Sequence, residues 1–213
     1  MKVAVVGHVE WVEFARVEAV PRPGEIVHAT EVWAEAAGGG AVAAVQLAKL
    51  AGEATFFTAL ADDELGKRSR EQLEQQGVRV HVTPAPAPQR RAFVHVDAVG
   101  ERTITVIGDK LVPRLKGDLP WEELRHADGV YFTGGDAGVL AAARKARVLV
   151  ATTRELPTLR AAAIELDALV GSGEDEGERY RVGDLEPAPG LVVTTSGGLG
   201  GWAQPGGLKH RSG

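Results

Sequence analysis

The stretch EAAGGGAVAAVQLAKLAG, residues 35–52, decides the fold because it places a run of glycines directly before an apolar helix. Over residues 39–50 only two side chains are polar, so this helix must be covered on most of its surface. The glycines have two interpretations. They permit close packing of the helix on a sheet, or they leave its first N–H groups open to a ligand. Taken alone, the run Gly38, Gly39 and Gly40 favours packing.

Strands and helices alternate on both sides of this helix. Residues 2–7 (KVAVVG) and 54–61 (ATFFTALA) are continuous apolar runs, which are typical of buried parallel strands. Between residues 119 and 172, three predicted helices alternate with three predicted strands, and the acidic stretch 174–181 predicts one more helix. This rhythm predicts an α/β fold around a mostly parallel sheet.

Two segments, residues 11–34 and 91–107, break the rhythm because they alternate polar and apolar residues as hairpins do. We expect them to pair with each other as a small separate sheet. The core domain is then predicted to comprise residues 1–10, 35–90 and 108–213.

Composition excludes several classes of function. The 213-residue chain carries a net charge of −5, which argues against nucleic acid or anionic lipid as a partner. It has no apolar run long enough for a membrane span and no cysteine, and its six histidines lack metal-binding spacing. A cytoplasmic location is the expectation.

Two places in the sequence are candidate ligand sites. In a parallel sheet ligands gather beyond the carboxyl ends of the strands, where His8, Glu10 and the glycine-led helix should meet. The turn TTSGGLGG, residues 194–201, can either cradle a phosphate or close a tight hairpin, and its residues do not decide between these. Trp11 and Trp33 can cover a sugar ring or join the small sheet to its neighbour.

Taken in order, four segments resemble the ribokinase/PfkB family of sugar and nucleoside kinases. They are residues 4–52, which include a P-x-P-G-E turn, then 56–78, 99–106 and 192–201. The resemblance implies a ribokinase-like, Rossmann-type three-layer sandwich with a small β-sheet lid formed by residues 11–34 and 91–107. It also implies transfer of phosphate from ATP, with Mg²⁺, to an alcohol group of a sugar, nucleoside or related small molecule.

The resemblance assigns roles to individual residues. It places the phosphate-accepting alcohol, called the acceptor below, against His8, Glu10, Trp11, Gly38, Gly39, Gly40 and Phe93. It places the nucleotide beside Thr195, Gly197 and Gly200.

Three positions depart from the family pattern. Val12 stands where the family carries an aspartate for sugar hydroxyls, and Val42 stands where it carries an asparagine. The Asn-x-x-Glu motif associated with Mg²⁺ is reduced to Ser172-x-x-Asp175, or to Gly173-x-x-Glu176 in another register. We therefore expect a less polar acceptor and name no metal-binding residue.

The family's Gly-Ala-Gly-Asp signature, whose aspartate is the catalytic base, does not follow the 194–201 turn in this sequence. No catalytic residue is therefore named, and the chain is interpreted as the N-terminal part of an ATP-dependent kinase. The alternative is a non-catalytic ligand-binding or dimerisation module with a kinase-like fold. In either case the open edges of the lid hairpins favour a homodimer through the lid.

Overall fold

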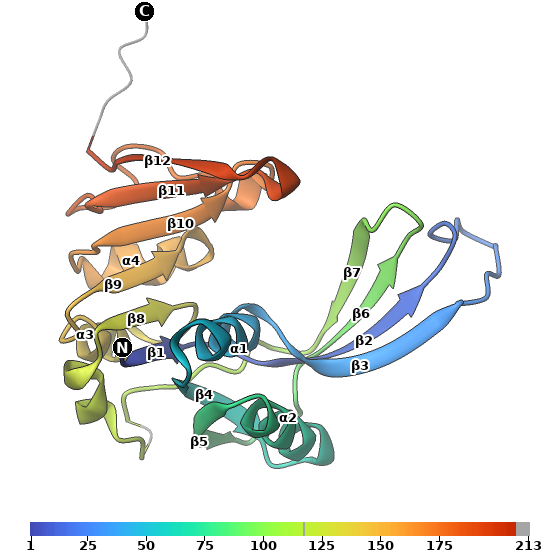
Figure 1. Cartoon of the computed structure of the whole chain (residues 1–213), viewed down its shortest axis with the longest axis horizontal. Helices are drawn as coiled ribbons and strands as arrows, with labels where there is room; N and C mark the ends of the chain where they lie inside the picture. Colours follow the sequence, from blue (N-terminus) through green and yellow to red (C-terminus); the bar gives the residue numbers. More distant parts are fainter. Residues whose placement is uncertain (117, 208–213) are drawn as a thin grey trace, which may run out of the picture.

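The computed structural model describes residues 1–116 and 118–207, which form two sheets (Figure 1). The main sheet has the order β12-β11-β10-β9-β8-β1-β4-β5, and only the β11–β12 pair is antiparallel. Its strands are β1 (Val3–Val6), β4 (Ala54–Ala61), β5 (Val78–Ala85), β8 (Gly129–Phe132), β9 (Leu149–Thr152), β10 (Ala168–Ser172), β11 (Leu191–Thr195) and β12 (Gly201–Pro205).

Helices lie on both faces of the main sheet. Helices α1 (Gly39–Ala51) and α2 (Glu64–Gln75) lie on one face, and α3 (Ala137–Ala143), α4 (Leu156–Ala162) and the 3₁₀ helix η1 (Trp121–His126) lie on the other. Because strand residues alternate in direction, Val5 packs in the core under α1 while its neighbour Val6 packs in the core under α3. This arrangement confirms the α/β three-layer sandwich.

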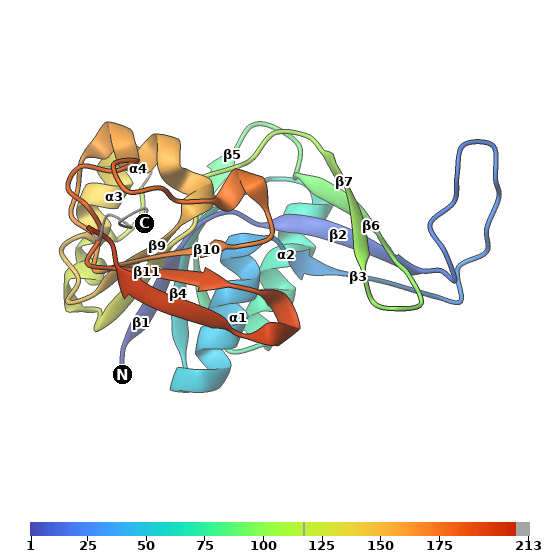
Figure 2. The same ribbon diagram turned by 90° about the horizontal axis from the view of Figure 1, so that it is seen from above.

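The second sheet has the order β3-β2-β6-β7 and projects away from the core (Figure 1). Its strands are β2 (Glu10–Arg16), β3 (Glu31–Ala37), β6 (Arg91–Val96) and β7 (Arg102–Ile107). The two hairpins pair with each other through β2 and β6, as expected, and this pairing is parallel. Residues 17–30 extend furthest from the core (Figure 2). We call this four-stranded sheet the lid.

Gln89 joins the lid to the core. Its side chain is 3% exposed, donates from Nε2 to the Val9 carbonyl (2.9 Å) and accepts at Oε1 from the Ala61 N–H (3.2 Å). Its own N–H donates to Asp63 Oδ2 (2.9 Å), and Asp63 also caps α2 by accepting from the Gly66 N–H (2.8 Å). Burial raises the pKa of Asp63, but these backbone N–H groups outweigh it and hold that pKa below its ordinary value.

Two helix predictions need correction. The acidic stretch 174–181 forms only the 3₁₀ turn η3 (Glu176–Glu178), because Asp175 accepts from the Gly177 N–H and Glu178 accepts from the Ser172 N–H. The segment 119–127 holds η1 in place of an α-helix. Two further 3₁₀ turns are η2 (Thr153–Glu155) and η4 (Gly197–Leu199). Of the predicted core, residues 117 and 208–213 lie outside the described residues. Each described helix is too short or too polar to cross a membrane.

Candidate functional site

Five parallel strands of the main sheet end at one edge. His8, Thr133 and Glu155 follow the ends of β1, β8 and β9, and Ser172 and Thr195 are the last residues of β10 and β11. Because the carboxyl ends of parallel strands form the usual ligand-binding edge of such sheets, this edge is the candidate site.

The glycines before α1 meet different demands. Gly38 has a φ of +86°, which favours glycine, and a Cβ on Gly40 would lie 2.7 Å from the His8 carbonyl oxygen. A Cβ on Gly39 would find its nearest neighbour at 3.6 Å, so nothing in the packing requires a glycine there. Within residues 1–116 and 118–207 no side chain caps α1, and its first turn contains no acidic residue. A glycine is therefore required at position 38 by the backbone conformation and at position 40 by packing, and the run leaves the start of α1 open.

His8 lies beside this open helix start. The residue is 9% exposed, and its Nδ1 has no hydrogen-bond partner among the described residues. Its Nε2 lies 3.6 Å from Glu10 Oε1, longer than a hydrogen bond. Burial lowers the pKa of His8, and the nearby charges of Lys110 and Arg90 lower it further. The imidazole is therefore neutral at pH 7, and the Glu10 carboxylate favours its proton on Nε2, which leaves Nδ1 to accept a hydrogen bond.

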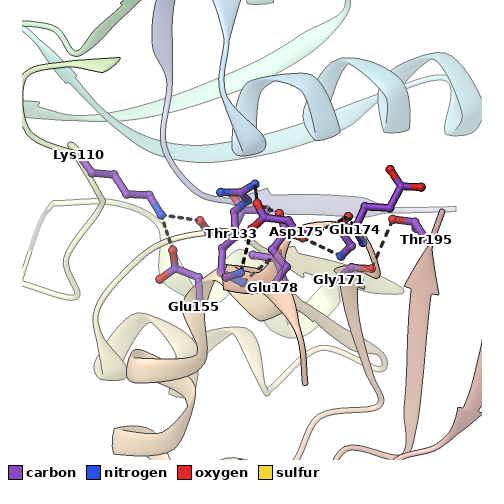
Figure 3. Close-up of polar contacts among 12 residues, drawn as sticks. Lys110, Thr133, Glu155, Gly171, Glu174, Asp175, Glu178 and Thr195 are labelled. Atoms are coloured by element: carbon purple, nitrogen blue, oxygen red, sulfur yellow. Dashed lines mark hydrogen bonds and ion pairs between the residues drawn. The ribbon is translucent and has the colours of Figure 1, made fainter. Parts of the chain in front are cut away.

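Two ion pairs flank His8. Arg90 Nε lies 2.6 Å from Glu10 Oε1, and Lys110 Nζ pairs with Glu155 while donating to the Thr133 carbonyl (3.2 Å; Figure 3). Burial raises the pKa of Glu10, but contacts with His8 and Arg90 outweigh it and hold that pKa below its ordinary value. Sequence analysis named only Glu10 of these charged residues.

A second polar network lies beyond Glu155 along the same edge (Figure 3). Arg154 Nη2 donates to Asp175 Oδ2 (2.9 Å), and the Arg154 guanidinium also pairs with Glu178. Ser172 Oγ accepts from the N–H groups of Glu174 (3.2 Å) and Asp175 (3.3 Å). The register Ser172-x-x-Asp175 is therefore the one that closes a turn at the end of β10.

The predicted nucleotide residues lie in the β11–β12 hairpin. Thr195 ends β11, and its hydroxyl donates to the Gly171 carbonyl (3.3 Å). Gly197 (φ +51°) and Gly200 (φ +88°) shape the turn through η4. The hairpin interpretation of this turn is confirmed. The phosphate interpretation stays a prediction, because a hairpin tip can also present N–H groups.

The described residues fit Mg²⁺ poorly. The carboxylates of Asp175 and Glu178 are both engaged by Arg154, and within residues 1–116 and 118–207 no group of three acidic or histidine side chains is placed to hold a metal. Glu174 is an exposed carboxylate of this loop, close to Gly197. Because Mg²⁺ commonly keeps several waters and substrate phosphates as ligands, one carboxylate can suffice only when a phosphate ligand is present.

The structure does not bring all the predicted acceptor residues together. Neighbouring residues of a strand point to opposite faces, so Trp11 lies on the other face of β2 from Glu10, and Arg68 of α2 lies 4.5 Å above its ring. Phe93 pairs in register with Glu13 and shares the face of Trp11. Trp33 lies on the Glu10 face, where it stacks on Phe14 with ring centroids 4.8 Å apart.

Two valines stand where the resemblance leads us to expect polar residues, and they differ in burial. Val12 is 4% exposed and packs with Ala92 and Val94 on the Glu10 face of the lid. Val42 lies in the first turn of α1 and is 50% exposed.

Comparison with known proteins agrees with this geometry. The model of the "pfkB family carbohydrate kinase" matches residues 1–160. A ribokinase of Dictyostelium discoideum is 29% identical over 108 residues, which are 50% of this chain and 34% of that protein. The match thus spans about a third of that relative.

Solved structures share the fold. A protein from Agrobacterium tumefaciens solved as a ribokinase superposes with a TM-score of 0.78 at 24% identity, covering 97% of this chain and 74% of that one. The Arabidopsis thaliana ribokinase, complexed with ribose and ATP, gives a TM-score of 0.67 at 21% identity, covering 97% of this chain and 75% of that one. At these identities the likeness establishes the fold.

Proposed function

This chain belongs to the pfkB family of carbohydrate kinases, and from that premise we propose that it acts in the transfer of a phosphate group from ATP to an alcohol group of a sugar, nucleoside or related small molecule. The observation that carries the proposal is the open start of α1 beside the buried imidazole of His8, whose Nδ1 has no hydrogen-bond partner among the described residues.

The proposed acceptor lies against His8, Glu10 and the glycines at the start of α1. The hydroxyl oxygen of the acceptor accepts hydrogen bonds from the free N–H groups of the helix, and the same hydroxyl donates a hydrogen bond to His8 Nδ1. Lid closure would exclude water from the transfer. We propose that Trp33 and Val12, which lie on the Glu10 face of the lid, cover the acceptor.

The proposed nucleotide contacts are Thr195, Gly197 and Gly200. The ribokinase of Arabidopsis thaliana was solved with ATP, which supports ATP as the donor here. Mg²⁺ would be held by the nucleotide's own phosphates together with Glu174, since Asp175 and Glu178 are already paired. We also propose a cytoplasmic setting and a homodimer through the lid.

The test uses a substitution that blocks the site without unfolding the protein. In Gly39→Asp, the new carboxylate lies in the first turn of α1, where the helix dipole favours it and where it competes with a ligand for the open N–H groups. We expect the KM for the alcohol to rise at least about tenfold, with little change in the KM for ATP. Gly39→Ala is the matched control, because a methyl group fits at this position without blocking the N–H groups.

The assay measures ATP consumption by the intact protein with a panel of sugars and nucleosides. Binding of an alcohol without any phosphate transfer would favour the alternative of a non-catalytic module. Equal activity of Gly39→Asp and Gly39→Ala would contradict the proposed acceptor site.

A further inference from the structure

We infer that Glu10 and Glu155 determine acceptor specificity: by neutralising Arg90 and Lys110 in advance, they reserve the acceptor site for an uncharged alcohol and select against phosphorylated ones. This inference rests on the proposed function, since it concerns the acceptor of the same transfer.

The first step is the pairing of the two cations nearest to His8. The Arg90–Glu10 pair is close (2.6 Å) and shielded, with side chains 20% and 13% exposed. The Lys110–Glu155 pair involves side chains 30% and 9% exposed, and Thr133 accepts a further N–H of Lys110. Because a phosphorylated substrate is usually held by unpaired arginine or lysine, this pairing neutralises the charges that would attract it.

The neighbouring cations in the sequence are engaged as well. Arg91, adjacent to Arg90, pairs with Glu13 (2.8 Å) on the opposite face of the lid. Arg154, adjacent to Glu155, pairs with Asp175 (2.9 Å). Because Arg154 also pairs with Glu178, these four cations face five carboxylates, and the charges of the pairs sum to −1.

The partial positive charge at the start of α1 is too small to make the site favour a phosphorylated acceptor. The N-terminus of an α-helix is equivalent to about half a positive charge. A phosphate monoester carries about −1.5 to −2 at pH 7. Such a group would also lie near the carboxylates of Glu10 and Glu155, whereas a hydroxyl accepts from the helix N–H groups and donates to His8 Nδ1 at no cost in charge. The apolar Val12 and Val42 agree with an acceptor of low polarity.

The experiment frees one cation and asks whether specificity changes. Glu10→Gln removes the carboxylate that pairs with Arg90. Glu13→Gln is the matched control, because Glu13 lies on the opposite face of the same strand as Glu10 and its loss frees Arg91. Calorimetry on the intact protein measures Kd for ribose, ribose 5-phosphate, fructose, fructose 6-phosphate and inorganic phosphate. Glu155→Gln, which frees Lys110, repeats the test should Glu10→Gln fail to fold.

We expect the wild-type protein and Glu13→Gln to bind a sugar more tightly than its phosphate and to bind inorganic phosphate weakly. In Glu10→Gln, the Kd for the sugar phosphate divided by the Kd for the sugar should fall at least about fivefold. This is the effect of one unit charge at ~4 Å in bulk water. Inorganic phosphate should gain affinity in the same variant.

Two results would overturn the inference while leaving the proposed function intact. One is wild-type binding and phosphorylation of a sugar phosphate at least as good as that of the sugar. The other is an equal change of specificity in Glu10→Gln and Glu13→Gln. Failure of every variant to bind any sugar, sugar phosphate or ATP would contradict the proposed function itself, and the inference with it.

Discussion

At the scale of the residue, the site depends on which small residues are sterically required. Gly39 and Gly40 are adjacent at the start of α1, yet a Cβ on Gly39 would make ordinary van der Waals contacts, whereas a Cβ on Gly40 would clash with the backbone of His8. Backbone atoms cannot rotate away as a side chain can, so the cost of a methyl group should differ sharply between the two positions.

We expect Gly40→Ala to lower the free energy of unfolding by about 2 kcal/mol or more, since the steric clash exceeds the ~1 kcal/mol gain in helix propensity. Gly39→Ala should stay within about 0.5 kcal/mol of the wild type. Urea unfolding followed by circular dichroism measures both. Equal losses in the two variants would contradict the packing described at Gly40.

His8 should make stability depend on pH in a defined direction. Burial lowers its pKa in the folded state, so below about pH 6.5 the unfolded chain takes up the proton first and stability falls as the pH falls. The slope from one such proton is at most about 1.4 kcal/mol per pH unit.

The variant His8→Gln lacks this titration. Between pH 7 and pH 5.5 its free energy of unfolding should therefore decline less than that of the wild type. Parallel urea titrations at several pH values provide the comparison, and an identical decline in both proteins would exclude a buried neutral imidazole at this position.

At the scale of the element, one amide side chain links the lid to the core at a buried position. Gln89 satisfies the Val9 carbonyl and the Ala61 N–H, and both are buried where β1, β4 and β6 approach one another. An apolar side chain would fill the space but leave these two backbone groups without partners.

Gln89→Leu should therefore destabilise the protein by about 2–4 kcal/mol. Gln46→Ala, an exposed change on α1, should have an effect within about 0.5 kcal/mol. Thermal and urea unfolding of the two variants test the difference. A Gln89→Leu protein as stable as Gln46→Ala would mean that the lid is held by other contacts.

A helix or strand was predictable from the sequence where neighbouring residues determine it. It was not predictable where residues far away in the chain determine it. The alternation in residues 11–34 and 91–107 revealed the hairpins, and the apolar runs 2–7 and 54–61 revealed two strands of the main sheet. The false helix over 174–181 arose because acidic side chains favour a helix start, whereas here Arg154, some twenty residues away, engages them.

The residues of the candidate site fall into the same two groups, predictable and not predictable from the sequence. His8, Glu10 and the glycines follow directly from strand and helix ends. Arg90, Lys110 and Glu155 reach His8 from other parts of the chain, and no motif marks them. One misplacement was avoidable: Glu10 and Trp11 are neighbours in a strand, so they point to opposite faces and cannot line the same one.

At the scale of the whole molecule, the lid presents exposed apolar side chains. Every residue of β7 is exposed, and Ile104 and Val106 lie on the Glu10 face of the lid at 52% and 45% exposure. Open strand edges at β3 and β7 add unpaired backbone groups. These features support the proposed homodimer through the lid.

If the lid forms that interface, Ile104→Lys should convert dimer to monomer, because it would bury a charge without a partner. Leu50→Lys, at an 82% exposed position of α1 remote from the lid, is the control and should leave the mass unchanged. Light scattering during size-exclusion chromatography reads the mass directly. A wild-type protein that elutes as a monomer at all concentrations would refute the lid interface.

The parallel pairing of β2 with β6 also sets an order of events in folding. Trp11 faces Arg91 across this pair, and the intervening chain contains α1, β4, α2 and β5. Each hairpin can form from neighbouring residues, but the two can meet only after that intervening chain has closed a long loop, which costs entropy before any contact is gained. The lid sheet is thus completed only when that part of the core has brought the two hairpins together, so its formation depends on the path of the chain through the core.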